Sequence, residues 1–170
     1  IATEAKPLVH HGDTKLHLAF SIFLFNSQGA LLLQQRALTK KTWPGVWSNS
    51  CCGHVMLHEK MIDAAKRRLK FELGISGVEL KLILPDFRYR AEKDGVVENE
   101  ICPVFVGVTD KLPRPNPDEV EAVKWVDWSD FQAEAASPDT DISPWAVEEI
   151  ELLIANKEFQ AFISGLTLRS

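Results

Sequence analysis

Two glutamates, Glu98 and Glu100, lie two residues apart in the segment from Val96 to Thr109, which is rich in β-forming residues. On a strand this spacing directs both carboxylates to the same face. Two like charges side by side are unfavourable unless a cation or a shared proton separates them. The chain also has five histidines, and imidazoles combined with carboxylates suit Mn²⁺, Mg²⁺ or Zn²⁺. The glutamate pair therefore indicates a divalent metal site, with a solvent-facing strand edge as the plainer alternative.

A cysteine with possible chemistry, Cys52, directly precedes Gly53-His54 in a loop rich in Trp, Pro, Gly and Ser. A thiol in such a loop loses its proton more easily when positive groups lie near it, and the thiolate is then a useful base. A lone cysteine is more often a small buried hydrophobe. We assign Cys51 and Cys102 to that interpretation and keep Cys52 as a candidate base.

A loop and helix motif runs from Gly53 to Ile75 and resembles the Nudix box, which holds divalent cations against a diphosphate. Its matching residues are Gly53, Glu59, Arg67, Leu69, Glu72, Gly74 and Ile75. Two acidic positions of the general box carry Arg68 and Phe71 in this chain. A Nudix hydrolase needs those carboxylates to hold the metals that activate its attacking water. The motif therefore predicts the fold but argues against simple diphosphate hydrolysis.

Five segments, in the same order, look like the type I isopentenyl diphosphate isomerase family. They are Thr14–Phe20, Trp43–His54, Asp86–Arg90, Val97–Pro103 and Ser143–Trp145. The resemblance covers roughly His10 to Trp145, which is most of the chain. Because separate segments match in order, the resemblance is highly specific.

The resemblance implies two metal sites. The family's His/Glu site corresponds to His10, His17, His54, Glu98 and Glu100. His10 competes with His11, and we choose His10 because its spacing of seven residues to His17 resembles the family's. Glu72 matches the carboxylate that, with the backbone carbonyl of Cys52, holds a Mg²⁺ bridging the diphosphate. The implied cofactors are thus Mg²⁺ at the diphosphate and Mn²⁺, Mg²⁺ or Zn²⁺ at the His/Glu site.

The resemblance also implies a reaction, the 1,3-allylic proton shift that interconverts isopentenyl and dimethylallyl diphosphate in isoprenoid precursor biosynthesis. Glu100, assisted by Tyr89, is expected to protonate the double bond, and Cys52 to remove a proton on the opposite face. Trp145 is expected to stabilise the intermediate carbocation with its indole face. Arginine and lysine suit phosphate contacts. Four such residues match the family's diphosphate-binding positions, namely Lys6, Arg36, Lys40 and Arg68.

Two other classes of function stay open at this point. One is a Nudix hydrolase of a nucleoside or sugar diphosphate, which Arg68 and Phe71 disfavour. The other is a non-catalytic module that binds a phosphorylated ligand and needs no thiol base. Release of phosphate or monophosphate would favour the first, and tight binding without turnover would favour the second.

Composition limits the classes of partner. A chain of 170 residues with 45% hydrophobic and 25% charged residues fits one domain, residues 1–170. The net charge of −5 gives no support for a nucleic-acid partner. Its most apolar stretch, Leu16–Phe25, is too short to span a bilayer. An odd number of cysteines without CxxC spacing favours a reducing compartment. We expect a cytoplasmic monomer with a small-molecule diphosphate substrate.

The elements that must position these residues follow from hydrophobic periodicity. We expect a hairpin of Leu16–Phe25 and Ala30–Gln35 around the turn Asn26–Gly29. The strand residues His17, Ala19 and Ser21 share a face, where small side chains beside a histidine leave room for a ligand. The other expected elements are a loop over Lys40–His54, a helix over Glu59–Leu73 ended by Gly74, strands over Val78–Leu84, Phe87–Ala91, Val96–Thr109 (with a bulge or edge at Pro103) and Val120–Trp128, a helix from Pro144 to about Ile154 capped by Ser143, and a final short helix.

The expected helix over Glu59–Leu73 carries Arg68 and Glu72 on or beside the stripe that faces the sheet, together with Met61, Ala65 and Leu69. Burying two charged groups there is costly unless something charged lies opposite. Because strands and helices are mixed without strict βαβ alternation, we predict the α+β class. The resemblance specifies a Nudix-type α/β/α sandwich with a mixed β-sheet.

Overall fold

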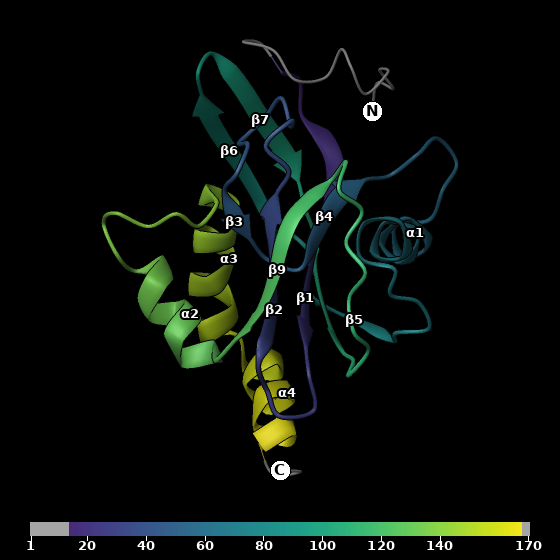
Figure 1. Cartoon of the computed structure of the whole chain (residues 1–170), viewed down its shortest axis with the longest axis vertical. Helices are drawn as coiled ribbons and strands as arrows, with labels where there is room; N and C mark the ends of the chain where they lie inside the picture. Colours follow the sequence, from purple (N-terminus) through teal and green to yellow (C-terminus); the bar gives the residue numbers. More distant parts are fainter. Residues whose placement is uncertain (1–13, 168–170) are drawn as a thin grey trace.

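A computed structural model describes residues 14–167 as a nine-stranded sheet with helices on both faces (Figure 1). The strands are β1 (His17–Phe25), β2 (Leu31–Arg36), β3 (Trp47–Ser48), β4 (Cys51–His54), β5 (Leu80–Leu84), β6 (Arg88–Lys93), β7 (Val96–Ile101), β8 (Val104–Val108) and β9 (Val120–Val126). The helices are α1 (Met61–Leu73), α2 (Trp128–Ala135), α3 (Pro144–Ala155) and α4 (Lys157–Thr167). None of these helices is long and apolar enough to span a membrane.

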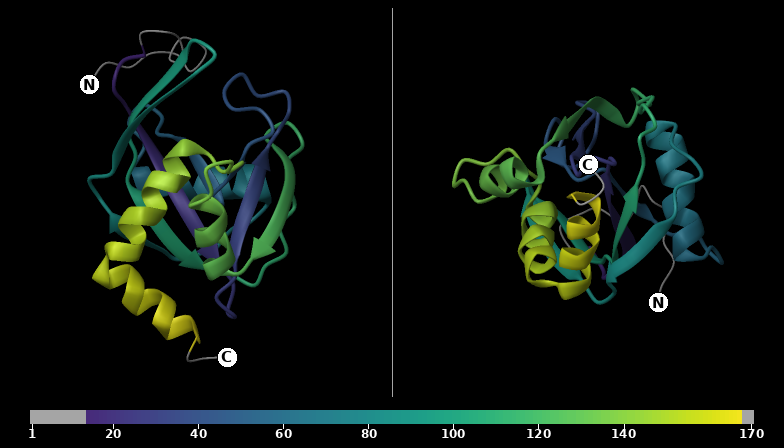
Figure 2. Two further views of the ribbon diagram at one scale, coloured as in Figure 1. Left: turned by 90° about the vertical axis from the view of Figure 1, so that its left-hand side faces the viewer. Right: turned by 90° about the horizontal axis from the view of Figure 1, so that it is seen from below.

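Strand β1 organises the sheet, because it pairs antiparallel with β2 and β4 and parallel with β7 and β8. Its alternating side chains contribute to two hydrophobic cores. Phe20, Ile22 and Leu24 pack on the α1 side, whereas Phe23 and Phe25 pack on the side of α2, α3 and α4. Figure 2 shows α1 on one face of the sheet and the other three helices on the opposite face. The predicted hairpin and the α/β/α sandwich are confirmed.

The strand predicted over 96–109 is interrupted at Pro103, the residue that indicated a bulge or edge, and the chain forms two strands, β7 and β8, instead of one. Proline lacks the N–H that a continuous ladder requires. Strand β7 pairs with the start of β1, opposite His17 and Leu18, and β8 pairs with β1 from Ser21 onward. Because of the break, the segment from 96 to 108 pairs with both the first and the second half of β1.

Two other segments contain a type of structure that differs from the prediction. The expected loop over 40–54 contains the short strands β3 and β4. The expected strand over 120–128 stops at Val126, and Trp128 begins helix α2, which the sequence did not indicate. These elements have only two to eight residues. Their hydrophobic periods are too short to identify them, and tertiary packing decides their conformation.

The structure confirms the predicted helix stop at Gly74 and the polar residues on the inner stripe of α1. Gly74 has a left-handed conformation with φ of 65°, which glycine adopts without strain. Arg68 and Glu72 are buried, at 9% and 3% exposed, beside Leu69. Ser143 precedes α3 as predicted, but its hydroxyl makes no capping bond and lies 2.9 Å from the Ser48 hydroxyl instead.

An ion pair in the Nudix-box region joins the loop before α1 to the helix. Arg67 donates from Nε and Nη2 to the Glu59 carboxylate at 2.7 and 2.8 Å, and the Met56 amide donates to the same carboxylate at 3.0 Å. The bonds from Arg67 lower the pKa of Glu59 from 4.5 to about 2. The fixed spacing of Glu59 and Arg67 in the motif therefore has a structural role.

Glu59→Gln is expected to lower Tm by about 1–3 °C at neutral pH, because it removes one partner of a partly exposed ion pair. A carboxyl with a lowered folded-state pKa stabilises the fold above its unfolded pKa, and this stabilisation disappears as the pH falls from about 4.5 to about 2. Thermal melts of both proteins across this range should therefore converge in acid. Glu158→Gln, which removes the exposed Lys81–Glu158 pair, is the control and should leave Tm unchanged. A Tm difference that persists at pH 2 would contradict the prediction.

Candidate active site

The pairing register of β1 places the candidate residues on one face. His17 lies opposite Glu100 on β7, and on β4 Ala19 lies opposite His54 and Ser21 opposite Cys52. Directly opposite residues in neighbouring strands project to the same face of a sheet. The small side chains of Ala19 and Ser21 leave room for the larger groups opposite them, as predicted from the alternation of β1.

Three predicted metal ligands converge at this face. The Nε2 atoms of His17 and His54 lie 3.1 Å apart, and Glu100 Oε1 lies 3.2 and 2.8 Å from them, respectively. In the described part of the chain, these residues form the group whose ligand atoms all lie within 4.8 Å of one another. Two imidazoles and a carboxylate suit a divalent transition-metal ion or Mg²⁺, so the donor set fits the expected cofactor. His10 lies outside the described residues.

Glu98, the remaining predicted ligand, is joined to Glu100 through Tyr89 rather than through the histidines. The Tyr89 hydroxyl lies 2.8 Å from Glu98 Oε2 and 2.8 Å from Glu100 Oε2. A hydroxyl has one proton and can donate to one of these oxygens at a time. The second contact requires a proton on a carboxyl group or a nearby cation. The hydrogen-bonded side chains of Glu98, Tyr89 and Glu100 can therefore hold an acidic proton.

Burial and charge act differently on the two carboxyls. Burial raises the pKa of Glu98, and the neighbouring Glu100 carboxylate raises it further. Burial also raises the pKa of Glu100, but the bonds from His17 and His54 outweigh burial and hold this pKa well below its ordinary value. Burial raises the pKa of Tyr89, which stays a phenol that can donate. The two histidines therefore favour the charged form of Glu100.

Cys52 lines the cavity from β4 and is held by buried polar groups. Its thiol donates to Asn49 Oδ1 at 3.2 Å and lies 3.5 Å from the Ser21 hydroxyl. Burial raises the pKa of the thiol, and the Glu149 carboxyl raises it further. Burial therefore favours the thiol form of Cys52 in this arrangement, and its role as a base stays a prediction.

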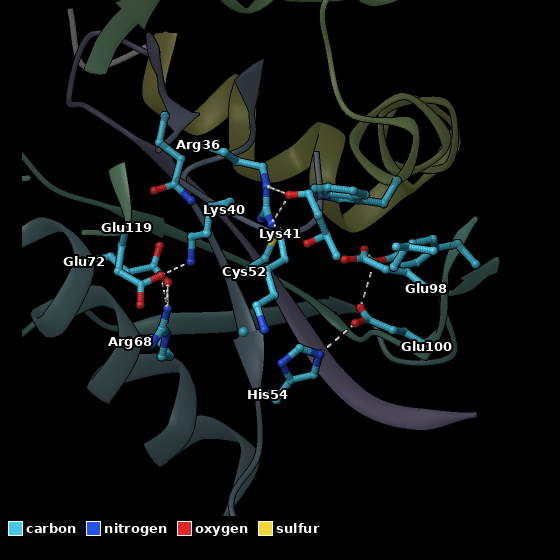
Figure 3. Close-up of a pocket in the computed structure, with 16 residues that line it drawn as sticks. Arg36, Lys40, Lys41, Cys52, His54, Arg68, Glu72, Glu98, Glu100 and Glu119 are labelled. Atoms are coloured by element: carbon cyan, nitrogen blue, oxygen red, sulfur yellow. Dashed lines mark hydrogen bonds and ion pairs between the residues drawn. The ribbon is translucent and has the colours of Figure 1, made fainter. Parts of the chain in front are cut away.

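Basic residues gather at the other end of the cavity. Arg68 Nε donates to Glu72 Oε1 at 2.9 Å, and its Nη2 lies 3.1 Å from Glu119 Oε2, which also pairs with Lys40. Figure 3 shows Lys40, Arg68, Glu72 and Glu119 on one side, Glu98 and Glu100 on the other, and Cys52 between them. Lysine and arginine in one pocket can bind the charge of a diphosphate.

Glycine is required where β4 crosses α1. A Cβ on Gly53 would lie 2.9 Å from the Cγ of Arg68 and 2.9 Å from the ring of Phe20. Such contacts are too short for carbon atoms. The glycine of the Nudix-box motif therefore allows Arg68 to lie beside Cys52 and His54 on β4.

Trp145 forms an aromatic wall of the cavity together with Tyr89. The two rings are 5.8 Å apart, and Trp145 is 2% exposed, with its indole N–H donating to the Ser48 hydroxyl at 3.0 Å. The Arg36 guanidinium lies 5.5 Å from the Trp145 ring centre, which is a cation–π distance. The ring thus already faces a cation. Another tryptophan, Trp47, is not among the residues that line this cavity.

The cavity has a volume of about 420 Å³, within the range of small-molecule sites. It brings together most of the predicted site residues, namely Arg36, Lys40, Cys52, His54, Arg68, Glu72, Tyr89, Glu98, Glu100 and Trp145. His17 contacts His54 and Glu100 at its margin, and Lys6 lies outside the described residues. Cys51 and Cys102 are buried in the two cores, as expected.

Four polar residues of the cavity were not predicted: Gln34, Lys41, Thr42 and Glu119. Gln34 lies two residues before Arg36 on β2, so the period of a strand could have placed it on the same face. Thr42 accepts two bonds from the Arg36 Nη2 group, one at its carbonyl and one at its hydroxyl. Glu119 had no sequence signal, because it reaches the cavity through the pairing of β9 with β2.

Comparisons with known proteins agree with this geometry. The NUDIX domain model matches residues 15–146. The MutT protein from Methanosarcina mazei superposes with a TM-score of 0.67 at 18% identity, covering 86% of this chain and 94% of that protein. The MutT NUDIX hydrolase from Burkholderia pseudomallei gives 0.59 at 20% identity, covering 81% and 97%. Fold and family model together define a NUDIX domain protein.

Three bacterial relatives carry the name isopentenyl-diphosphate Delta-isomerase. The protein from Saccharopolyspora erythraea is 54% identical over 155 residues, which are 91% of this chain and 80% of the relative. The Mycolicibacterium vanbaalenii protein is 49% identical, covering 91% and 86%, and that of Escherichia coli 46% identical, covering 94% and 88%. This chain belongs to the isopentenyl-diphosphate Delta-isomerase family.

Proposed function

We propose that this chain interconverts isopentenyl and dimethylallyl diphosphate by protonation and deprotonation. The observation that carries the proposal is one cavity in which the Cys52 thiol and the Glu100 carboxyl come from strands on different sides of β1, with a basic cluster at the far end. A five-carbon chain with a diphosphate needs these three features at once, namely an acid, a base and an anion-binding end.

The proposed proton shift uses the two groups in opposite senses. In one direction, Glu100 with Tyr89 protonates the double bond, and Cys52 removes the proton from the carbon that joins the new double bond. The pKa directions favour a Cys52 thiol and a Glu100 carboxylate. In this protonation state Cys52 can give a proton and Glu100 can remove one, which is the reaction in the opposite direction. Transfer of one proton from Cys52 to Glu100 gives the protonation state for the first direction. Positioned groups of this kind typically contribute about 10²–10⁴-fold each.

We propose that two divalent cations complete the site. His10, His17, His54, Glu98 and Glu100 would hold Mn²⁺, Mg²⁺ or Zn²⁺, and Glu72 with the Cys52 carbonyl would hold Mg²⁺ at the diphosphate. When bound, these ions supply positive charge that balances the clustered carboxylates and the diphosphate. Arg36, Lys40, Arg68 and Lys6 would bind and orient the substrate's phosphate oxygens.

Trp145→Ala is expected to lower kcat by about 30-fold with a much smaller change in KM, because loss of about 2 kcal/mol of cation–π stabilisation slows formation of the carbocation. Trp145→Phe keeps an aromatic face and should lose less. Trp125→Ala, which removes a half-buried ring packed on the α1 side, is the control and should leave kcat unchanged. A change in KM alone for Trp145→Ala would contradict carbocation stabilisation.

The reaction itself is tested by incubation with isopentenyl diphosphate in heavy water, with deuterium uptake followed by NMR. Deuterium should enter the substrate carbons, dimethylallyl diphosphate should accumulate, and a chelator should abolish both. Release of phosphate from a nucleoside or sugar diphosphate, without deuterium uptake, would instead identify a hydrolase. Tight binding without turnover at saturating Mg²⁺ and Mn²⁺ would identify a binding module.

We also propose that the enzyme works as a monomer in the cytoplasm on a small-molecule substrate. All three cysteines are free thiols in the structure, and the proposed role of Cys52 needs a reduced sulfur. Reducing compartments keep such thiols available. Size-exclusion chromatography with light scattering, and localisation of the tagged protein in its host, test these two statements.

A further inference from the structure

A buried glutamate lies behind Cys52 and has no place in the mechanism above. Glu149, on α3, is 0% exposed. It follows Trp145 by four residues, so both side chains project from the same face of the helix toward the sheet. The Ser21 hydroxyl donates to Glu149 Oε2 at 2.9 Å, whereas Glu149 Oε1 has no hydrogen-bond partner among the described residues. A buried carboxyl with one unpaired oxygen is costly to the fold.

The bond to Glu149 fixes the orientation of Ser21. The serine hydroxyl has one proton, which it gives to Glu149, so its oxygen is left to accept. It accepts from Asn49 Nδ2 at 2.7 Å and faces the Cys52 sulfur at 3.5 Å. Asn49 is itself held, because the same amide nitrogen donates to the Ile22 carbonyl at 3.0 Å. Its Oδ1 then points to the Cys52 thiol, 3.2 Å away.

We infer that Glu149 is a positioning residue for Cys52, which acts through Ser21 and Asn49 to hold the sulfur at the cavity wall. The four side chains come from β1, the β3–β4 connection, β4 and α3, and all but Cys52 are fully buried. This inference rests on the proposed function, since it assigns a role relative to the proposed base. It goes beyond that function because Glu149 does not line the substrate cavity.

The chemistry of the carboxyl agrees with a role as a neutral hydrogen-bond acceptor. Burial raises the pKa of Glu149 well above its ordinary value, the bond from Ser21 lowers it in part, and the Glu100 carboxylate raises it again. A neutral acid accepts from Ser21 through its carbonyl oxygen, and so does the amide of glutamine. Leucine has a similar volume but no acceptor.

The test compares Glu149→Leu, Glu149→Gln, Ser21→Ala and the double variant Ser21→Ala with Glu149→Leu. Glu149→Leu is expected to lower kcat by about 10- to 100-fold with KM within about threefold, because a small displacement of a reacting group is costly while the diphosphate site is untouched. Glu149→Gln should stay within about threefold of the unmodified enzyme. The double variant should be no slower than the slower single variant, because both changes interrupt the same connection.

Glu148→Leu is the matched control, since Glu148 is the exposed neighbour on the same helix and should leave kcat and KM unchanged. Circular dichroism and Tm verify the fold of each variant. If Glu149→Leu does not fold, the inference is tested by Ser21→Ala alone. This variant should then show the loss of kcat expected for Glu149→Leu, with KM unchanged.

Several outcomes would overturn the inference: unchanged kcat in Glu149→Leu, additive losses in the double variant, or equal losses in Glu149→Gln and Glu149→Leu. Absence of turnover by the unmodified chain would instead refute the proposed function. The two failures are therefore distinguishable in one set of assays.

Discussion

Cys52→Ala is expected to lower kcat for isomerisation by about 10²–10⁴-fold while leaving the fold intact. The variant loses the group proposed to exchange a proton with the substrate from the β4 side, whereas the basic cluster and the His17–His54–Glu100 group are unchanged. Steady-state kinetics by NMR, together with Tm, measure the two effects. KM should change little, because the diphosphate contacts lie elsewhere in the cavity.

The adjacent thiol provides the control for Cys52. Cys51 lies opposite Ile22 on β1 and packs on the α1 side of the sheet. Cys51→Ala should therefore lower Tm slightly, through loss of a buried sulfur, and keep kcat near that of the unmodified enzyme. Turnover by Cys52→Ala at a near-normal rate would refute its assignment, and equal loss in both variants would indicate a structural cause.

Glu100→Gln is expected to have a second large effect, a loss of about 10²–10⁴-fold in kcat together with weaker metal binding. The amide keeps the shape of the side chain but has no acidic proton to give and no charge for a cation. It also removes the negative charge that lies 3.2 and 2.8 Å from the Nε2 atoms of His17 and His54. Turnover measured across a chelator titration separates the two effects, because excess metal can restore occupancy but not the acid.

A glutamate on the neighbouring strand serves as the control for Glu100. Glu92 on β6 has an exposed side chain, 56% accessible, so Glu92→Gln should change neither kcat nor the metal requirement. Near-normal isomerisation by Glu100→Gln at saturating Mn²⁺ and Mg²⁺ would refute its role as the acid. In that case, Glu98, which shares the Tyr89 hydroxyl, would be the next candidate to replace.

Local pattern was sufficient for the elements with a clear period. The alternation along β1 correctly separates Phe20 and Ile22 from His17 and Ser21, and the stripe of α1 correctly places Arg68 and Glu72 inward. Where the period is short or broken, local pattern failed. The two-residue strand β3 and the start of α2 at Trp128 depend on partners that are distant in the sequence.

The residue types of the site, the faces of β1 and α1, and the family of the chain could all be identified from the order of its amino acids. Tertiary structure alone decided which of these side chains meet. His17 and Glu100 are 83 residues apart, and Ser21 and Glu149 are 128 residues apart. The physical reason is that strand register and the packing of α3 on the sheet are set by non-local burial, whereas the periods of strands and helices are local properties of the chain. For the same reason Glu119 and Glu149 had no sequence signal, because each gains its role only from neighbours contributed by distant segments.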